Sequence, residues 1–405
     1  MKKDALKVVI ATERALHYSC VLRGTMPLEH LSRKGLVNYG HFSFDPENPD
    51  LPASLDACDL VLVFALGDTR WSQFTQYLQR EHGKKVVVDF DDDLWDVSPM
   101  NFAYEGLGTR EVPVNYRDKD GTLQKKMLWM DGHSPNFWIQ DNRLRLSMAS
   151  EMARQADAIT VSTKRLQHSM LEHNGDVRVM ENCVDLGVWR TDVNRKHEGF
   201  RVGWQGGDSH RHDMYVVAEQ LGRFLKDHPE ATLVLSGTFI PELKEFVPVD
   251  RVEFHPWVNS EAYPYLMMTL GLDLGIAPLA HTRFNTRKSA LKWLEYGAMG
   301  VPCFASAVPP YTDYIRHGED GHLLENGDWY DALSDAYKRR GAVKALGRRA
   351  HDRVAKDFDI RKRCGEWLDA YTDIARGEPR FKQARQCTLP LAGGGFRTRW
   401  NALKA

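Results

Sequence analysis

The chain has 405 residues, 42% of them hydrophobic and 27% charged, and its 54 Lys and Arg against 55 Asp and Glu leave a formal net charge of -1. This balance excludes a disordered, collagen-like or coiled-coil chain, and the length predicts two or three domains. No apolar run approaches the ~18 residues that a membrane helix needs, so we expect a cytoplasmic protein without a transmembrane segment. The six cysteines form no C-x-x-C pair, so we expect reduced thiols rather than a zinc ribbon or a disulfide framework.

The first half of the chain alternates short β-branched or Leu-rich runs with amphipathic stretches. Such alternation is typical of βαβ units built around a parallel sheet. The amphipathic stretches predict helices at 71–82 and 141–156. The apolar runs predict strands at 7–12, 60–64, 85–89 and 158–162.

A second series of apolar runs follows the polar stretch 190–199, which we predict to be the linker between two domains. Two series of parallel strands predict an α/β protein with two doubly wound domains, at 1–190 and 200–358. The strands of the second series are expected at 200–204, 232–236, 251–254, 272–277 and 301–305.

Two segments break the alternation. Residues 101–140 have no clear period but carry six aromatic residues, which predicts a structured insertion, and insertions of this length are commonly functional or mobile. The tail 376–405 carries seven basic residues against one acidic residue, together with a run of three glycines, and is predicted to be flexible.

The segment 284–302 is the richest in chemistry. Asn285 is expected to cap a helix that runs to about Met299. On that helix Lys288, Lys292 and Glu295 stand at i, i+4 and i+7, with Arg287 beside them, so they share one face. Cations near a helix N-terminus favour an anion such as a nucleotide diphosphate, and Glu295 could accept hydrogen bonds from ribose hydroxyls. The alternative is an exposed helix with ordinary Lys–Glu pairs.

A glycine-bearing turn follows the first strand of the second half. Gly206 and Gly207 would let the backbone approach a phosphate or a sugar closely. After the turn, His210 and Asp213 could reach the sugar, or they could merely cap the next helix.

Several of these pieces together resemble one enzyme family. Lys288-Ser-x-x-Lys292-x-x-Glu295, Gly300-Val-Pro302 and His317-Gly-x-x-Gly321 are similar to the donor-binding end of the group 1 glycosyltransferases, glycosyltransferase family 4, which have the GT-B fold. In the first half, Arg23-x-x-x-Pro27 and the run 89–95 fall where such proteins carry related pieces. The resemblance covers about residues 7–375 and is strongest over 272–322.

The resemblance implies two Rossmann-like domains that face a cleft. A nucleotide sugar, UDP- or GDP-linked, would bind the C-terminal domain, and the acceptor would bind the N-terminal one. A helix at about 359–375 would cross back to the first domain. By the same resemblance Glu295 would hold the ribose, Lys288 would hold the diphosphate, and Trp257 would lie beside the base, although Trp257 could instead belong to the core.

One position departs from the family pattern. Arg287 stands where the usual Glu-x7-Glu places its first glutamate, and only the second, Glu295, is retained. In the family the first glutamate contacts the transferred sugar, so the identity of that sugar stays open.

The acidic run Asp89, Asp91, Asp92 and Asp93 ends a predicted strand. Crowded carboxylates repel one another, which is tolerated mainly where function or a cation compensates. Because this strand end would face the cleft, Asp91 or Asp89 could orient an acceptor hydroxyl or accept its proton. A magnesium or manganese site of Asp-x-Asp type is possible, although GT-B enzymes generally need none. The alternative is a helix N-cap cluster.

The expected reaction moves a sugar to an acceptor hydroxyl, and the resemblance favours retention of the anomeric configuration. Lys288 and Arg287 would stabilise the leaving diphosphate, so no metal is obligatory. We expect a glycan or small-molecule acceptor, bound by residues such as Arg23 and Trp95 and by aromatic rings of the insertion. Those insertion rings could equally form a small core of their own; they are Tyr116, Trp129 and Trp138.

Two alternatives stay open for the function. The first is a phage-type DNA glycosyltransferase that acts on 5-hydroxymethylpyrimidine bases, with basic residues of the insertion on the DNA phosphates. The second is a non-catalytic nucleotide-sugar-binding protein, which the replacement by Arg287 motivates. The basic residues concerned in the first are Arg110, Arg117, Lys119, Lys125 and Lys126.

Overall fold

The computed structural model describes residues 5–12, 17–42, 55, 57–64, 69–117, 120–193 and 197–378. The tail beyond residue 378, Lys119 and part of the predicted linker lie outside the described residues. None of the helices in the described ranges is both long enough and apolar enough to cross a membrane.

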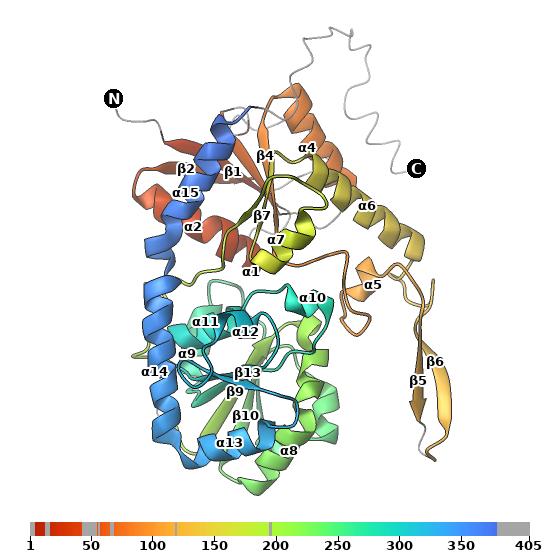
Figure 1. Cartoon of the computed structure of the whole chain (residues 1–405), viewed down its shortest axis with the longest axis vertical. Helices are drawn as coiled ribbons and strands as arrows, with labels where there is room; N and C mark the ends of the chain where they lie inside the picture. Colours follow the sequence, from red (N-terminus) through yellow and green to blue (C-terminus); the bar gives the residue numbers. More distant parts are fainter. Residues whose placement is uncertain are drawn as a thin grey trace.

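The N-terminal half forms a six-stranded parallel sheet in the order β2-β1-β3-β4-β7-β8 (Figure 1). Its central strands are almost wholly buried, which explains why they read as continuous apolar runs. Among the helices of this half are α1 (Tyr18–Cys20), α2 (Met26–Arg33), α4 (Thr69–Glu81), α6 (Ile139–Gln155) and α7 (Lys164–Met170). The strands are β1 (Leu6–Thr12), β2 (Val37–Phe42), β3 (Leu60–Phe64), β4 (Lys85–Phe90), β7 (Ala158–Val161) and β8 (Val177–Val179).

The C-terminal half forms a second six-stranded parallel sheet in the order β11-β10-β9-β12-β13-β14. This is the 3-2-1-4-5-6 order of a doubly wound nucleotide-binding domain, whose ligands bind at the carboxyl ends of the strands. The α/β class with two doubly wound sheets is therefore confirmed. The strands are β9 (Phe200–Gly206), β10 (Ala231–Gly237), β11 (Val252–Pro256), β12 (Leu274–Ala277), β13 (Cys303–Ser306) and β14 (His322–Leu324), and the helices include α8 (Ala218–Asp227), α9 (Tyr263–Thr269), α10 (Arg283–Thr286), α11 (Leu291–Ala298), α12 (Tyr311–Tyr314) and α13 (Trp329–Lys338).

The segment 101–140 is structured. It contains helix α5 (Tyr104–Leu107) and an antiparallel hairpin, β5 (Val112–Arg117) with β6 (Leu123–Trp129), that extends away from the body of the molecule (Figure 1). At the base of the hairpin, Trp129 packs on the buried rings of Tyr104 and Phe137. Trp129 therefore belongs to a small core of the insertion, which was the alternative to a role in acceptor binding.

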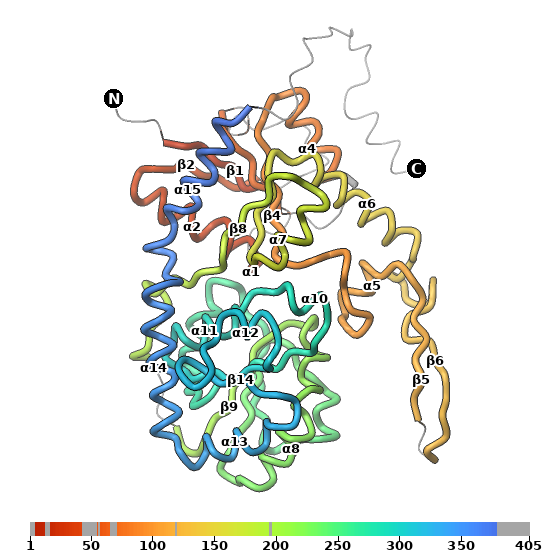
Figure 2. Tube along the Cα trace, viewed as in Figure 1, coloured from red at the N-terminus to blue at the C-terminus, as the bar shows by residue number. Residues whose placement is uncertain are grey.

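Two long helices run along one side of the molecule, α14 (Arg340–Asp357) beside the second sheet and α15 (Ile360–Arg376) beside the first (Figure 2). Helix α15 packs into the core of the first sheet through Trp367 and Tyr371. The indole Nε1 of Trp367 also donates to the backbone oxygen of Arg23 at 3.1 Å. The last described helix is therefore anchored on the N-terminal sheet.

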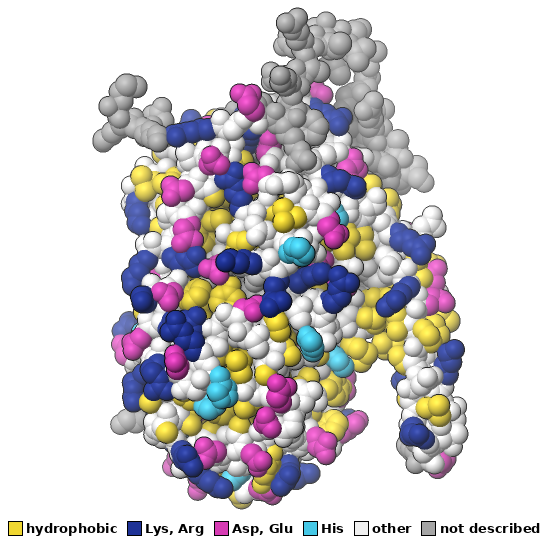
Figure 3. Space-filling view, in the orientation of Figure 1, with side chains coloured by type: hydrophobic (Ala, Val, Ile, Leu, Met, Phe, Trp, Pro, Cys, Tyr) yellow, Lys and Arg dark blue, Asp and Glu magenta, His cyan; other side chains and the backbone are white. Residues whose placement is uncertain are grey.

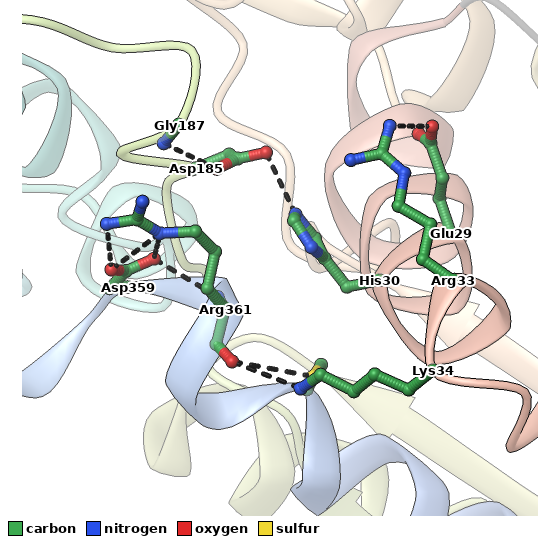
Figure 4. Close-up of polar contacts among 9 residues, drawn as sticks. Glu29, His30, Arg33, Lys34, Asp185, Gly187, Asp359 and Arg361 are labelled. Atoms are coloured by element: carbon green, nitrogen blue, oxygen red, sulfur yellow. Dashed lines mark hydrogen bonds and ion pairs between the residues drawn. The ribbon is translucent and has the colours of Figure 1, made fainter.

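Within the described ranges the chain passes between the two halves at two places, near Val184 and near Asp359, and these two segments lie side by side. Val184 exchanges backbone hydrogen bonds with Phe358 and Ile360, both at 3.0 Å. Helix α2 braces the crossing: His30 Nε2 lies 2.8 Å from Asp185 Oδ2, and Lys34 Nζ donates to the backbone oxygen of Arg361 at 3.3 Å (Figure 4).

Candidate active site

A cavity of about 510 Å³ lies between the two sheets, at the carboxyl ends of their strands. Its volume is within the range of ligand pockets, ~300–1,000 Å³. Both halves of the chain contribute to its wall. The residues singled out from the sequence that line it are Asp91, Asp92, Gly206, Gly207, His210, Trp257, Lys288, Lys292 and Glu295.

The glycine turn after β9 forms part of the wall, as predicted. Gly206 ends the strand, and a Cβ atom added at Gly207 would lie 3.3 Å from the ring of Trp257. Trp257 lines the cavity and is 60% exposed. The alternative that Trp257 is a core residue is therefore wrong.

The predicted helix is shorter than expected. Helix α11 begins at Leu291, and Asn285 belongs to the separate short helix α10. The Asn285 side chain does not cap α11; its Nδ2 donates to Asp213 Oδ1 at 2.8 Å and to the Ala280 oxygen at 2.9 Å. Lys288 therefore lies in the turn before the helix, yet it lines the same cavity as Lys292 and Glu295.

Glu295 is buried, with 2% of its surface exposed, and accepts three hydrogen bonds. Tyr18 donates to Oε1 at 2.6 Å, while Tyr263 and Gln205 donate to Oε2 at 2.9 and 3.2 Å. Burial raises the pKa of Glu295, and the three hydrogen bonds oppose that rise. The alternative of an exposed helix with ordinary Lys–Glu pairs is therefore wrong.

Lys292 is 9% exposed, and its ammonium group has no hydrogen-bond or ion-pair partner among the residues that the structure describes. Burial and the nearby Lys288 lower the pKa of Lys292 to about 8. Lys288 bonds to Asp92 Oδ1 at 2.7 Å across the cavity. The carboxylates of Asp213 and Glu295 oppose the shift in the pKa of Lys292, but neither contacts its ammonium group. A desolvated lysine without such a contact is costly unless a ligand supplies the anion.

His210 and Asp213 are bonded to each other, Nδ1 to Oδ2 at 2.8 Å, but only His210 lines the cavity. Asp213 is buried behind it and accepts from the Ala280 amide at 2.9 Å. Asp213 therefore positions His210 and the loop before α10, rather than reaching a ligand or capping a helix. Burial and Lys292 lower the pKa of His210 to about 4, so its imidazole is neutral at pH 7.

Arg23 and Asp89 lie beneath the cavity and not in it. Arg23 is 1% exposed and binds both carboxylate oxygens of Asp89 at 2.7 Å, while Thr160 donates to Asp89 at 2.7 Å. A side chain that is buried and paired in this way cannot contact an acceptor or accept its proton. The predicted roles of Arg23 in acceptor binding and of Asp89 in catalysis are corrected to a structural ion pair.

The remaining aspartates of the acidic run divide between the cavity and the domain junction. Asp91 and Asp92 line the cavity, but Asp93 is 1% exposed and bonds to Ser169 at 2.7 Å and to Arg287. No helix begins at Asp93; its Oδ1 accepts from the amide of Trp95 in a turn. Among the described residues, no group of three or more His, Cys, Asp or Glu side chains is placed to hold a metal ion.

Arg287 does not line the cavity. Its guanidinium reaches across to Asp93 and to Asp96, the latter at 3.0 Å, and its backbone oxygen accepts from Thr163 at 2.8 Å. Arg287, the residue that departs from the family pattern, thus joins the two domains. Its predicted contact with the nucleotide-sugar donor is corrected. Figure 3 shows Lys and Arg side chains gathered along this seam, where α7 faces α10.

The two tryptophans predicted to bind an acceptor lie away from the cavity. Trp95 donates from Nε1 to Ser150 at 2.8 Å and stacks on His173 with a centroid separation of 4.3 Å. Trp138 is 48% exposed at the base of the hairpin. Neither side chain lines the cavity, so the cavity gives no support to their predicted role in acceptor binding.

Sequence reasoning missed Tyr18 and Tyr263, which line the cavity and hold Glu295. The run 181–185 also falls where the family carries a related piece, but sequence reasoning gave no role to its Asn182, whose Nδ2 donates to Ser289 at 2.8 Å across the domain junction. Tyr18 and Asn182 are more than 100 positions from their partners, so no local pattern marked them.

Comparisons with known proteins agree with this geometry. Residues 200–340 match the family described as "Glycosyl transferases group 1". One curated relative, N-acetyl-alpha-D-glucosaminyl L-malate synthase of Bacillus anthracis, is 24% identical over 251 residues, which span 56% of this chain and 62% of that protein.

Solved structures match nearly the whole chain. The Anabaena protein HepE in complex with UDP and glucose has a TM-score of 0.59 at 13% identity, covering 91% of this chain and 99% of that one. Sucrose-phosphate synthase from Thermosynechococcus elongatus has a TM-score of 0.59 at 14% identity, with the same coverage of 91% and 99%. The chain therefore has the GT-B fold, and its residues 200–340 match the group 1 glycosyltransferases.

Proposed function

We propose that the protein transfers a sugar from a nucleotide-diphosphate sugar, most simply a UDP-sugar, to an acceptor hydroxyl. The observation that carries this proposal is Lys292, a buried ammonium group that faces the cavity without a protein partner among the described residues. With Lys288 beside it, the cavity has two cations for one diphosphate. The solved relative that holds UDP and glucose in the same fold supports the choice of donor.

The other lining residues fit the rest of such a donor. Glu295 would accept hydrogen bonds from the ribose hydroxyls, and Trp257 would offer a ring to the base. Gln205 Oε1 is buried and has no hydrogen-bond partner among the described residues, so it could accept a hydrogen bond from the ligand. Gly206 and Gly207 line the cavity, and a Cβ atom at Gly206 would lie 2.7 Å from the Trp204 ring, so glycine is needed there to make room for Trp204.

In the reaction, the bond between the anomeric carbon and the diphosphate oxygen breaks, and the acceptor oxygen bonds to that carbon. Lys288 and Lys292 would stabilise the charge that develops on the leaving diphosphate, commonly the largest catalytic term. Asp91, which lines the cavity from the opposite domain, would orient the acceptor hydroxyl and take its proton. We propose retention of configuration, and no obligatory metal because the two lysines supply the charge.

The proposed acceptor is a glycan or a small molecule with a hydroxyl group. The name of the curated relative pairs an N-acetylglucosaminyl group with malate, a small hydroxy acid, which makes malate one acceptor to try. Hydroxymethylated DNA is the alternative acceptor, and the same assay distinguishes the two.

The test is release of the nucleoside diphosphate from a panel of UDP-, GDP-, ADP- and TDP-sugars, with and without magnesium or manganese. Each donor is offered with malate, simple glycosides or hydroxymethylated DNA. We expect release from a UDP-sugar, stimulated by one small acceptor and lost in Glu295→Gln. No release from any donor, together with no binding of any nucleoside diphosphate in calorimetry, would contradict the proposal.

A further inference from the structure

Two donor-binding side chains of the C-terminal domain are bonded to residues of the N-terminal domain. Tyr18, from α1, donates to Glu295 Oε1 at 2.6 Å, and its ring packs edge-on against Tyr263 with a centroid separation of 5.2 Å. Lys288 Nζ lies 2.7 Å from Asp92 Oδ1. Both contacts lie inside the cavity, since all five residues line it.

Glu295 has too few free acceptor positions for a ribose while Tyr18 stays bonded. A carboxylate offers about four lone-pair positions, and Tyr18, Tyr263 and Gln205 use three of them. A ribose presents two neighbouring hydroxyls and needs two positions. One of these three side chains must therefore break its hydrogen bond to Glu295 before both ribose hydroxyls can bind.

Of the three hydrogen-bonding partners of Glu295, Tyr18 can leave without disturbing the C-terminal domain that would bind the nucleotide sugar. Tyr263 on α9 and Gln205 on β9 belong to the same half of the chain as Glu295, and both bond to Oε2. Among the residues that the structure describes, Tyr18 is the only one from the opposite half that donates a hydrogen bond to Glu295, and it alone bonds to Oε1. Its hydroxyl thus occupies the position that a ribose hydroxyl would take.

Lys288 is in the same situation. Its side chain is 12% exposed, and its ammonium group is paired with Asp92, whose side chain is 42% exposed. A diphosphate that bound Lys288 would compete with Asp92 for that ammonium group. The two contacts therefore place a hydroxyl and a carboxylate of the N-terminal domain on the groups that would hold the ribose and the phosphate.

We propose that Tyr18 and Asp92 are internal competitors of the donor: they hold Glu295 and Lys288, and a nucleotide sugar binds only by displacing them. The inference rests on the proposed function. Donor binding then exchanges contacts between the two domains for contacts to the nucleotide sugar, so the exchange weakens the affinity for that sugar.

The first test measures UDP affinity of the full-length chain by isothermal titration calorimetry. Tyr18→Phe keeps the ring and removes the hydroxyl. We expect UDP to bind about tenfold more tightly, because the variant loses the hydrogen bond to Glu295 that stabilises the UDP-free protein and loses nothing in the UDP complex. The matched control is Tyr263→Phe, which removes a bond to the same carboxylate from within the donor domain. UDP should bind this variant equally or more weakly.

The second test concerns the ion pair. Asp92→Asn should tighten UDP binding several-fold, because UDP no longer has to break an ion pair in order to bind Lys288. Its control is Asp313→Asn, which removes another ion pair between the two halves, Arg165–Asp313 at 2.6 Å. That pair lies outside the cavity, so its loss should leave UDP affinity unchanged.

The outcomes separate this inference from the proposed function. If the unmodified chain binds no nucleoside diphosphate, both fall. If it binds UDP but Tyr18→Phe binds equally or more weakly, with an unchanged thermal unfolding midpoint, only the inference falls. Equal tightening in Tyr18→Phe and Tyr263→Phe would overturn it too, because the gain would then come from any freed position on Glu295.

Discussion

Each half of the molecule buries a cation near the cleft, and the two cations differ in their hydrogen-bond partners. In the N-terminal half, Arg23 bonds to Asp89, to the backbone oxygen of Met180 and to Asn182, at distances from 2.7 to 2.8 Å. In the C-terminal half, Lys292 has no such partner among the described residues. One charge is satisfied by the protein, and the other faces the cavity.

This contrast separates structural charges from binding charges better than residue type does. A buried ion pair that meets all its hydrogen-bonding needs holds the fold, and it is costly to break from one side. A buried cation without a partner lowers stability and is tolerated where a ligand uses it. Substitutions at Arg23 should therefore affect folding, and substitutions at Lys292 should affect binding.

The largest effect is expected for Arg23→Met. Removing the guanidinium leaves the buried Asp89 carboxylate unpaired, and breaking a buried pair from one side costs ~3–5 kcal/mol. Urea unfolding would measure this loss. The double variant Arg23→Met/Asp89→Leu should recover much of it, because an apolar pair leaves no charge unpaired. A loss below ~1 kcal/mol in the single variant would show that Arg23 does not anchor this half.

Lys292→Met should show the reverse pattern. UDP affinity should fall by ~10- to 100-fold, because a charge-assisted contact to the diphosphate is lost. Unfolding stability should stay the same or rise, because a desolvated charge is removed. Calorimetry with UDP and urea unfolding of the same sample check both parts. A loss of stability without a loss of affinity would make Lys292 a structural residue like Arg23.

The central strands and their order along the chain could be predicted from the sequence, because their residues are buried on both faces and form continuous apolar runs. The strand expected at 60–64 is found at β3, and each of the other expected strands differs from the observed one by at most two residues at either end. Three strands were missed at the sheet edges. One of them, β2, is partly exposed and contains Asn38 and Gly40, so it lacks the continuous apolar run of a central strand.

The site could be predicted only in part from the sequence, because contacts between residues far apart in the chain decide its local structure. Nothing in Arg287, Lys288 or Ser289 argues against a helix from 285 to 299. In the structure, however, these three residues bond across the cleft to Asp93, Asp92 and Asn182 respectively, and α11 begins only after them. Likewise, the pairing of Arg23 with Asp89, 66 positions away, could not be seen from either residue alone.

The pH dependence of UDP binding sharpens the contrast further. Because the pKa of Lys292 is lowered to about 8, the ammonium group loses its proton as pH rises from 7 to 9, and UDP affinity should fall by up to ~tenfold. The unfolded chain keeps its lysine proton up to a pKa of ~10.4, so it binds more protons between these values, and stability should rise over the same window. Lys292→Arg, always charged, should bind UDP with an affinity independent of pH. A fall that persists in Lys292→Arg would assign the titration to another group.

The smallest effect is expected at the rim of the cavity, for Trp257→Ala. The ring is 60% exposed, so it excludes little water and contributes only from one side. Stacking of an aromatic side chain on a base is worth ~1–3 kcal/mol, and partial exposure favours the lower end, so UDP affinity should fall ~fivefold. Trp257→Phe should retain most of the affinity, and inorganic diphosphate, which has no base, should bind Trp257→Ala as it binds the unmodified chain. An equal loss for UDP and diphosphate would show that Trp257 acts through the glycine turn that it contacts at Gly207 rather than through the base.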